Sequence, residues 1–322
     1  MNAIVFVLSL LALGIASAVV WLSLTDPTPD GFVLDRARYP FQSQFMDLPD
    51  GSRLHYLDEG QGPTLLLLHG NPTWSFLYRQ LIHGLKDEFR LVVPDYPGFG
   101  LSTASSGYGF TPAEHAQAVG QLVERLDLQD ALILMQDWGG PIGFKLALQQ
   151  PERFKGFVIG NTWAWPLERL RHKVFSMVMG GWPGQLSAWC CNGVVRAFMS
   201  RGVAGQLSAP ELAMYLGPFS RADSRSPTHI FPAQLRNASD FLGDVYRNLP
   251  RLSDRPVLLL WGEKDFAFQK PERDRFESLF PDHETVLLEG AGHFIQEDAP
   301  EAIVGAIRDW SKKTFSKRDE SG

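Results

Sequence analysis

Gln136-Asp137-Trp138-Gly139-Gly140 marks a sharp change of pattern in this chain. The apolar run 131–135 precedes it and has the composition of a buried strand, whereas residues 141–149 have the composition of a helix. The two glycines permit a tight turn and a close approach between strand and helix. The sequence therefore predicts a strand, a sharp turn that presents Asp137, and a helix.

Apolar runs alternate with helical segments on both sides of this turn. Residues 41–58 read as a β-hairpin around the turn Pro49-Asp50-Gly51. The further expected strands are residues 64–68, 90–94, 131–135, 157–160, 257–261 and 285–288, and the expected helices are residues 76–85, 111–126, 141–149 and 300–310. Wholly apolar strands separated by helices predict an α/β fold with a mostly parallel sheet that helices cover on both faces.

Residues 163–249 break this alternation, because they are rich in Trp, Met, Phe, Gly and Pro and contain no clear strand. We expect a helical cap inserted after the sixth strand, on a core formed by residues 41–162 and 250–314. The cap aromatics are expected to pack against one another or the core, and some of them to line a pocket. These aromatic residues are Trp165, Phe175, Trp182, Trp189 and Phe198.

The N-terminal run from Ala3 to Leu24 carries no charge. As a helix it would span roughly 33 Å, which is enough for a bilayer core. Residues 1–24 are therefore predicted to be a transmembrane anchor, followed by a linker over residues 25–40. The alternative is a signal peptide cleaved near Ala16-Ser17-Ala18. The expected localisation is membrane-anchored, and the sequence does not set which side of the membrane the rest of the chain faces.

Composition narrows the class of partner. The 322 residues carry a net charge of -6 and no long basic run, which argues against a nucleic-acid partner. The two cysteines, Cys190 and Cys191, are adjacent and offer neither metal-ligand spacing nor a favourable disulfide. The sequence leaves oligomeric state open, so a homo-oligomer remains an alternative.

Three residues have the types and the chain order of a nucleophilic triad. A carboxylate nucleophile such as Asp137 attacks saturated carbon and becomes an alkyl ester, whereas a serine would be acylated. His293 follows the last expected strand in a glycine-rich loop and is the candidate base. Asp265 follows the penultimate strand and is expected to orient that base, with Glu263 as the competing acid. The alternative for Asp137 is a helix N-cap.

Two neutral donors accompany the triad. Asn71 lies directly after the expected strand 64–68, and Trp138 follows the nucleophile. An amide and an indole N–H can stabilise a departing anion in a dry pocket without trapping it as a cation would. Packing alone is the alternative reading for Trp138.

These residues resemble the haloalkane dehalogenases of the α/β-hydrolase superfamily over residues 40–312, with Asp265, Asn71 and Trp138 as in the third subgroup. The stretches that carry the resemblance are His69-Gly70-Asn71-Pro72, Asp95-Tyr96-Pro97-Gly98-Phe99-Gly100, Gln136-Asp137-Trp138-Gly139-Gly140, Trp261-Gly262-Glu263-Lys264-Asp265 and Gly290-Ala291-Gly292-His293-Phe294. The resemblance implies an eight-stranded sheet and no metal or organic cofactor. It also implies that a small apolar halogenated substrate and water give alcohol and halide through an ester on Asp137. Asn71 and Trp138 would bind the halide with their side chains and form the oxyanion hole with their backbone N–H groups.

Two other functions stay open at this point. An epoxide hydrolase would share the Asp-His-Asp triad but needs acidic phenols, for which the cap offers Tyr215 and Tyr246. A membrane-tethered binding protein on the same fold is the second, because a fold alone does not prove catalysis.

Overall fold

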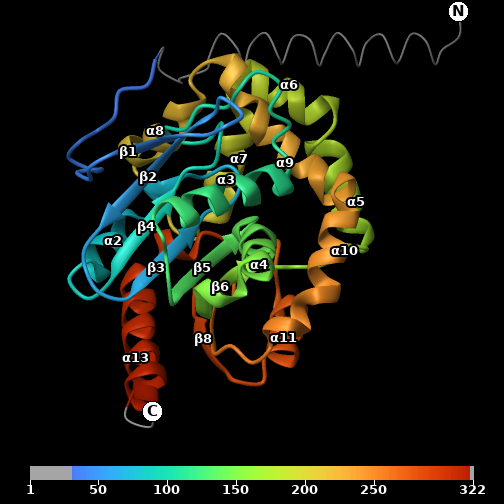
Figure 1. The fold of residues 1–322 in the computed structure, drawn as a ribbon. Coiled ribbons are helices and arrows are strands. Elements are labelled where there is room, and N and C mark those ends of the chain that lie inside the picture. Colours follow the sequence, from blue (N-terminus) through green and yellow to red (C-terminus); the bar gives the residue numbers. More distant parts are fainter. Residues whose placement is uncertain (1–30, 320–322) are drawn as a thin grey trace, which may run out of the picture.

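A computed structural model describes residues 31–319, and one eight-stranded sheet forms its centre (Figure 1). The strands are β1 (Gln44–Asp47), β2 (Arg53–Glu59), β3 (Thr64–Leu68), β4 (Arg90–Pro94), β5 (Ala131–Asp137), β6 (Phe154–Thr162), β7 (Val257–Gly262) and β8 (His283–Leu288). Their order is β1-β2-β4-β3-β5-β6-β7-β8. β2 pairs antiparallel with β1 and β4, and the pairings from β4 through β8 are parallel. The predicted α/β fold with a mostly parallel sheet is confirmed, as is the hairpin at its edge.

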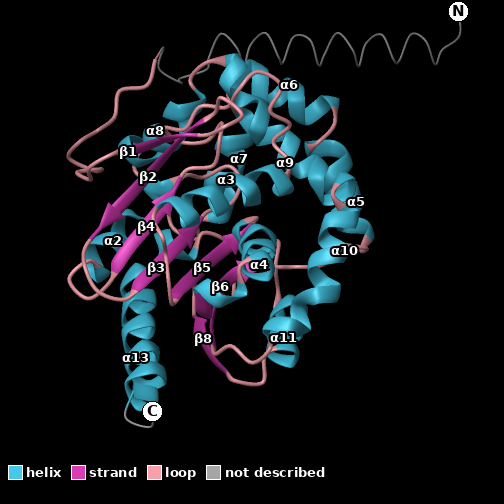
Figure 2. Ribbon diagram, in the orientation of Figure 1, coloured by secondary structure: helices cyan, strands magenta, loops and turns pink. Residues whose placement is uncertain are grey.

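The central strands are apolar because helices cover both faces of the sheet. All seven residues of β5 are buried, as are the four leucines of β3. Figure 2 shows this layered arrangement, with the strands between helices. The helices of the α/β part are α2 (Arg79–Leu85), α3 (Pro112–Arg125), α4 (Gly139–Gln149), α11 (Lys270–Leu279), α12 (Ile295–Asp298) and α13 (Pro300–Asp319).

A capping box sets where α3 begins. Thr111 Oγ1 accepts a hydrogen bond from the Glu114 backbone N–H at 3.2 Å, and the Thr111 N–H donates to Glu114 Oε2 at 2.9 Å. Each residue thereby satisfies a backbone or side-chain group of the other at the open end of the helix. The helix that was expected over residues 76–85 is divided, since Ser75–Tyr78 form a 3-10 turn before α2.

Six α-helices follow one another between β6 and β7. They are α5 (Leu170–Met179), α6 (Trp182–Cys191), α7 (Gly193–Gly202), α8 (Ala209–Leu216), α9 (Ser226–Asn237) and α10 (Ser239–Asn248). In Figure 1 most of them gather above the upper end of the sheet and along its right side. Several of their residues share a cavity with residues that follow strands β3, β5, β6, β7 and β8.

The predicted membrane-anchored localisation was wrong. Across residues 31–319, no helix is both long enough and apolar enough to cross a bilayer. The run from Ala3 to Leu24, on which the prediction of a transmembrane anchor or a signal peptide depended, lies outside the described residues. The apolar segments that the structure does describe form the buried sheet and the helices that pack against it.

The segment predicted to be a linker is described from residue 31 onward, and its last residues pack onto the core. Phe32 contacts Trp74 with ring centroids 5.9 Å apart. Tyr39 is fully buried, and its hydroxyl lies 2.6 Å from Ser75 Oγ. These contacts tie residues 32–39 to the start of the 3-10 turn that precedes α2.

Candidate active site

Asp137 stands at the sharp turn between β5 and α4. It is the last residue of β5 and has a φ of +50°, a conformation that non-glycine residues rarely adopt. The chain around it leaves no room for larger neighbours. A Cβ atom on Gly70 would lie 2.3 Å from Asp137 Oδ1, and one on Gly139 would lie 2.2 Å from the Leu68 carbonyl oxygen. The glycines of the two motifs thus allow three chain segments to meet at this carboxylate.

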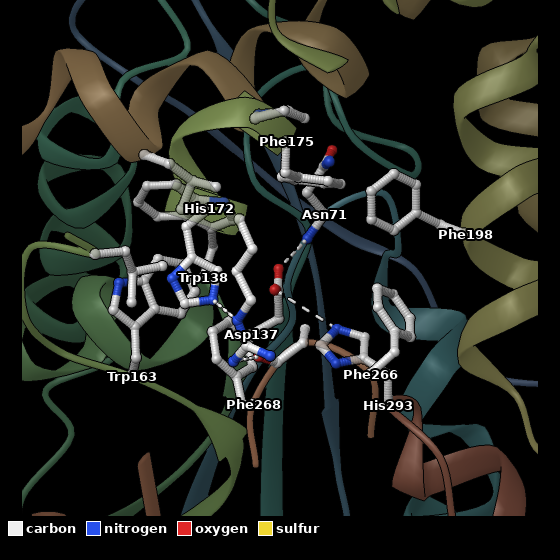
Figure 3. A pocket seen from close by; sticks show the side chains of 15 residues that line it. Asn71, Asp137, Trp138, Trp163, His172, Phe175, Phe198, Phe266, Phe268 and His293 are labelled. Carbon is white, nitrogen blue, oxygen red and sulfur yellow. Dashed lines mark hydrogen bonds and ion pairs between the residues drawn. The ribbon is translucent and has the colours of Figure 1, made fainter. Parts of the chain in front are cut away.

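The histidine and the second carboxylate predicted from the sequence meet Asp137. His293 follows β8 in the chain, and Asp265 follows β7. His293 Nδ1 lies 3.0 Å from Asp265 Oδ2, and its Nε2 lies 3.6 Å from Asp137 Oδ2 (Figure 3). All three side chains are buried. The imidazole of His293 therefore lies between two carboxylates, Asp137 and Asp265, that are far apart in the sequence.

These two carboxylates set the charge of the imidazole. Burial by itself would lower the pKa of His293, but the charge of Asp265, followed by the hydrogen bond to Asp137, raises it to about 10. Opposite charges at short range in a buried site favour the protonated ring. Removing the negative charge of Asp137 would remove part of this effect and lower the pKa of His293.

Two amide side chains bind the segment around His293, and no role was predicted for either of them from the sequence. Asn161 Nδ2 donates to the Gly292 carbonyl at 2.8 Å, and Asn161 Oδ1 accepts from the Gly262 N–H at 2.8 Å. Gln136 Nε2 lies 3.2 Å from His293 Nε2 and donates to the His293 carbonyl at 3.1 Å. Gln136 adjoins the nucleophile in the chain, which was the available signal. For Asn161, near the end of β6, the sequence offered no such signal.

Asn71 reaches the nucleophile through its backbone. Its N–H donates to Asp137 Oδ1 at 2.9 Å. Its side-chain amide donates to the Thr228 carbonyl of α9 at 3.2 Å, so one of the two amide N–H groups is already engaged. The residue therefore joins the carboxylate to the helices between β6 and β7.

Trp138 is buried and lines the cavity beside Asp137. Among residues 31–319 its indole N–H makes no hydrogen bond to a protein acceptor, which leaves this donor for a ligand. Within the same part of the chain, the Trp138 backbone N–H makes no hydrogen bond to the Asp137 carboxylate. Of the two backbone donors predicted for the oxyanion hole, Asn71 is thus the one that contacts Asp137 in this state.

An apolar cavity of about 220 Å³ lies in front of the carboxylate. Its aromatic lining comprises Trp138, Trp163, Phe175, Phe198, Phe266 and Phe268. Figure 3 shows these side chains around Asp137, with His293 on one side and His172 on the other. Of the cap aromatics singled out in the sequence, only Phe175 and Phe198 line this cavity, whereas Trp182 and Trp189 are 65% and 52% exposed.

The tyrosines that an epoxide hydrolase would need do not reach this cavity. Tyr215 is fully buried and donates its hydroxyl hydrogen to Glu297. Tyr246 packs against Trp165 with ring centroids 6.0 Å apart. Neither residue is among those that line the cavity in the described part of the chain. Nor does that part contain a group of three or more His, Cys, Asp or Glu side chains arranged to hold a metal ion.

Comparison with known proteins agrees with the geometry. The family described as alpha/beta hydrolase fold matches residues 63–300. The chain is 44% identical to "Haloalkane dehalogenase 2" of Mycobacterium tuberculosis over 278 residues, which are 86% of this chain and 97% of that protein. The chain belongs to the haloalkane dehalogenase family. It is an α/β-hydrolase, and the prediction of this family from the sequence is confirmed.

Two further comparisons describe its neighbourhood. The crystal structure of haloalkane dehalogenase DbeA from Bradyrhizobium elkani has the same fold, with a TM-score of 0.77 and 24% identity over 84% of this chain and 97% of that one. The chain is also 32% identical to "Cis-3-alkyl-4-alkyloxetan-2-one decarboxylase" of Xanthomonas campestris over 84% of this chain and 96% of that protein. This chain is thus also similar in sequence to a protein that is named for a different reaction.

Proposed function

We propose that this protein hydrolyses the carbon–halogen bond of a small apolar substrate, with Asp137 as the nucleophile. The observation that carries the proposal is the placement of His293 between Asp137 and Asp265, beside an apolar cavity with an unused indole N–H. The partners are the halogenated substrate and water. Residues 163–249 would form the cap over residues 41–162 and 250–314, because Phe175, Phe198 and Leu235 close the cavity opposite Asp137.

In the first step, an oxygen of Asp137 attacks the carbon that bears the halogen, in line with the bond that breaks. The carbon–oxygen bond forms as the halide leaves with the bonding electrons. The Trp138 indole N–H and the free N–H of the Asn71 amide stabilise the outgoing ion. Preorganised donors in a site that excludes water stabilise developing charge strongly, because little reorganisation is needed.

In the second step, water attacks the carboxyl carbon of the ester while His293 removes its proton. Esterification has removed the negative charge of Asp137, so the pKa of His293 falls and its ring becomes a base. Asp265 holds Nδ1 at 3.0 Å and stabilises the imidazolium that forms. The backbone N–H of Asn71, already 2.9 Å from Asp137 Oδ1, stabilises the oxyanion together with the backbone N–H of Trp138. As this intermediate collapses, the bond to the alkyl oxygen breaks, and the leaving oxygen takes the proton from the imidazolium and departs as the alcohol. The proton left on the carboxyl group returns to His293, which restores the Asp137 carboxylate.

Trapping the ester tests the mechanism. In His293→Phe, the first step should proceed and the second should stop, because general-base assistance typically supplies about 10²- to 10⁴-fold. Incubation with 1-bromobutane should release about one bromide per protein and leave a butyl group on the chain, read by intact mass and mapped to Asp137. The double variant Asp137→Ala/His293→Phe is the control and should gain no mass. Loss of turnover in His293→Phe without an adduct would reject the proposed role of His293.

A second activity is favoured by sequence relatives. Two proteins that are 31% and 32% identical to this chain are named cis-3-alkyl-4-alkyloxetan-2-one decarboxylases. The apolar cavity suits alkyl groups. The Asp137 carboxylate could open a strained ring by the same kind of attack that displaces a halide. Carbon dioxide release from a cis-3,4-dialkyl oxetan-2-one, measured beside bromide release from 1-bromobutane, distinguishes the two reactions. Carbon dioxide without bromide would replace the dehalogenase proposal.

A further inference from the structure

The apolar cavity carries one positive charge that the proposed reaction does not use. Arg171 and His172, in the first turn of α5, line the cavity together with its aromatic residues. Arg171 is the only lysine or arginine among the described lining residues, and its side chain is exposed to solvent. It therefore lies where the cavity meets water, whereas Asp137 and His293 are buried.

The guanidinium of Arg171 has only neutral partners. Its Nε donates to His172 Nε2 at 3.0 Å, its Nη1 to Gln269 Oε1 at 3.2 Å, and its Nη2 to the Ala267 carbonyl at 3.5 Å. No ion pair within residues 31–319 includes Arg171. An arginine has five N–H donors, so these contacts leave one N–H on each terminal nitrogen. A guanidinium with one unused N–H on each terminal nitrogen can donate both to a carboxylate.

These contacts also position the guanidinium. They join α5 to the loop between β7 and α11, which carries Asp265. The Ala267 N–H, next to the carbonyl that Arg171 contacts, donates to Asp265 Oδ1 at 2.7 Å. The charge is therefore held at a fixed place relative to the catalytic residues. A substrate that contacts both Arg171 and Asp137 must have a matching length.

His172 does not add to or cancel this charge. Because its Nε2 accepts from Arg171, the ring proton is on Nδ1 and the ring is neutral. Burial, and then the charge of Arg171, lower the pKa of His172. The pair thus presents a single positive charge, delocalised over the guanidinium.

The surroundings of the cavity mouth strengthen the attraction for anions. Leu167 and His172 also line a neighbouring polar groove of about 520 Å³. This groove contains Arg169, Arg247 and Arg275, against the two carboxylates Glu168 and Glu272. Together with Arg171, four arginines face two glutamates in a chain whose net charge is -6. Such a local excess of positive charge raises the concentration of anions near the mouth.

We infer that Arg171 is a specificity residue that favours halogenated substrates with a carboxylate at the end remote from the carbon–halogen bond. The inference rests on the proposed function and names its substrate class, an ω-haloalkanoate. The alkyl chain fills the apolar cavity, and the halogenated carbon reaches Asp137. The carboxylate stays at the mouth in contact with water, so it meets the guanidinium without a large desolvation cost.

The test compares ω-bromoalkanoates with 1-bromoalkanes of equal carbon number over a series of chain lengths. In Arg171→Gln, kcat/KM for the carboxylates should fall about five-fold at the best length, which corresponds to one exposed charge pair. The value for the neutral bromides should stay within about two-fold, since an exposed side chain adds little to binding of an alkyl chain. Arg171→Glu should lower the carboxylate value further by repulsion. Added salt should weaken the carboxylate preference of the wild type more than that of Arg171→Gln.

Arg169→Gln is the matched control, because Arg169 lines the neighbouring groove but not the catalytic cavity. It should reduce the carboxylate preference less than Arg171→Gln does. Equal changes for both substrate classes in Arg171→Gln, or no preferred chain length, would overturn this inference alone. Absence of bromide release from both classes in the wild type would instead reject the proposed function, and the inference with it.

Discussion

Asp137 is a buried carboxylate whose negative charge helps to raise the pKa of His293. Its backbone φ of +50° aims the side chain at His293, and its Oδ1 accepts the Asn71 N–H. In the proposed mechanism, the carboxylate that attacks carbon therefore also favours the protonated form of His293 before the reaction. Esterification would change both properties at once, which would set the order of the two steps.

This coupling predicts the titration of His293. Burial lowers the pKa of the ring, but Asp265 and Asp137 raise it to about 10. Asp137→Asn removes one of the two negative charges and should lower the pKa of His293, so that the neutral ring appears at a lower pH than in the wild type. Ring resonances followed by NMR across a pH titration measure this directly. Asp58→Asn is the control, because Asp58 pairs with Arg90 away from the site. An unchanged His293 titration in Asp137→Asn would contradict the coupling.

At the scale of elements, a buried ionic junction joins α8 to the α/β part of the chain. Arg79 of α2 contacts Glu297 of α12, with Nη2 and Oε2 2.8 Å apart, and its Nη2 lies 3.0 Å from Glu211 Oε1 of α8. Tyr215 of α8 donates to Glu297 as well. The Arg79 and Glu297 side chains are 7% and 3% exposed, whereas that of Glu211 is 30% exposed. The deep pair should therefore matter more to stability than the outer one.

Glu297→Gln is predicted to lower the free energy of unfolding by about 3 kcal/mol, because it leaves the buried Arg79 without its closest charge. Glu211→Gln should cost less than about 1 kcal/mol, since that pair is more exposed. Glutamine can still accept from the Ser208 N–H, so the cap of α8 is retained in the control. Urea unfolding of both variants gives the comparison. Equal costs would show that burial does not distinguish the two pairs.

The sequence predicted the elements whose signals are local. The apolar runs located the central strands, and the helix expected over residues 111–126 is α3. The grouping of Asp137, Asp265 and His293 could be predicted because each lies at or after the carboxyl end of a strand, where the chain order brings them together. The contacts of Asn161 with Gly292 and of Arg171 with Ala267 were not predicted, because they join segments that are distant in the sequence. Phe198 and Trp189 are both aromatic, so the sequence likewise could not show that Phe198 lines the cavity and that Trp189 is exposed.

At the scale of the whole molecule, two parts of the chain divide the work of the site. The ends of β3, β5, β7 and β8 supply the groups that the proposed mechanism uses, and the helices between β6 and β7 supply much of the apolar wall. Asn71 joins the two parts through its hydrogen bond to Thr228. Changes in the helical wall should therefore alter which substrates fit, while changes at the strand ends should alter the chemistry.

Phe198 of α7 offers the sharpest test of this division. Its ring lies 5.8 Å from that of Phe175 and 6.5 Å from that of Phe266, measured between centroids. Phe198→Ala should widen the cavity beyond its present volume of about 220 Å³, so longer 1-bromoalkanes gain kcat/KM relative to 1-bromobutane. One added methylene in an apolar pocket is worth about 1–3 kcal/mol, which corresponds to roughly 10- to 200-fold in preference. Trp189→Ala removes an exposed aromatic of α6 and should leave the length profile unchanged. A uniform loss across all lengths in Phe198→Ala would mean that this wall supports the chemistry itself, since a substrate-sizing wall changes long and short substrates differently.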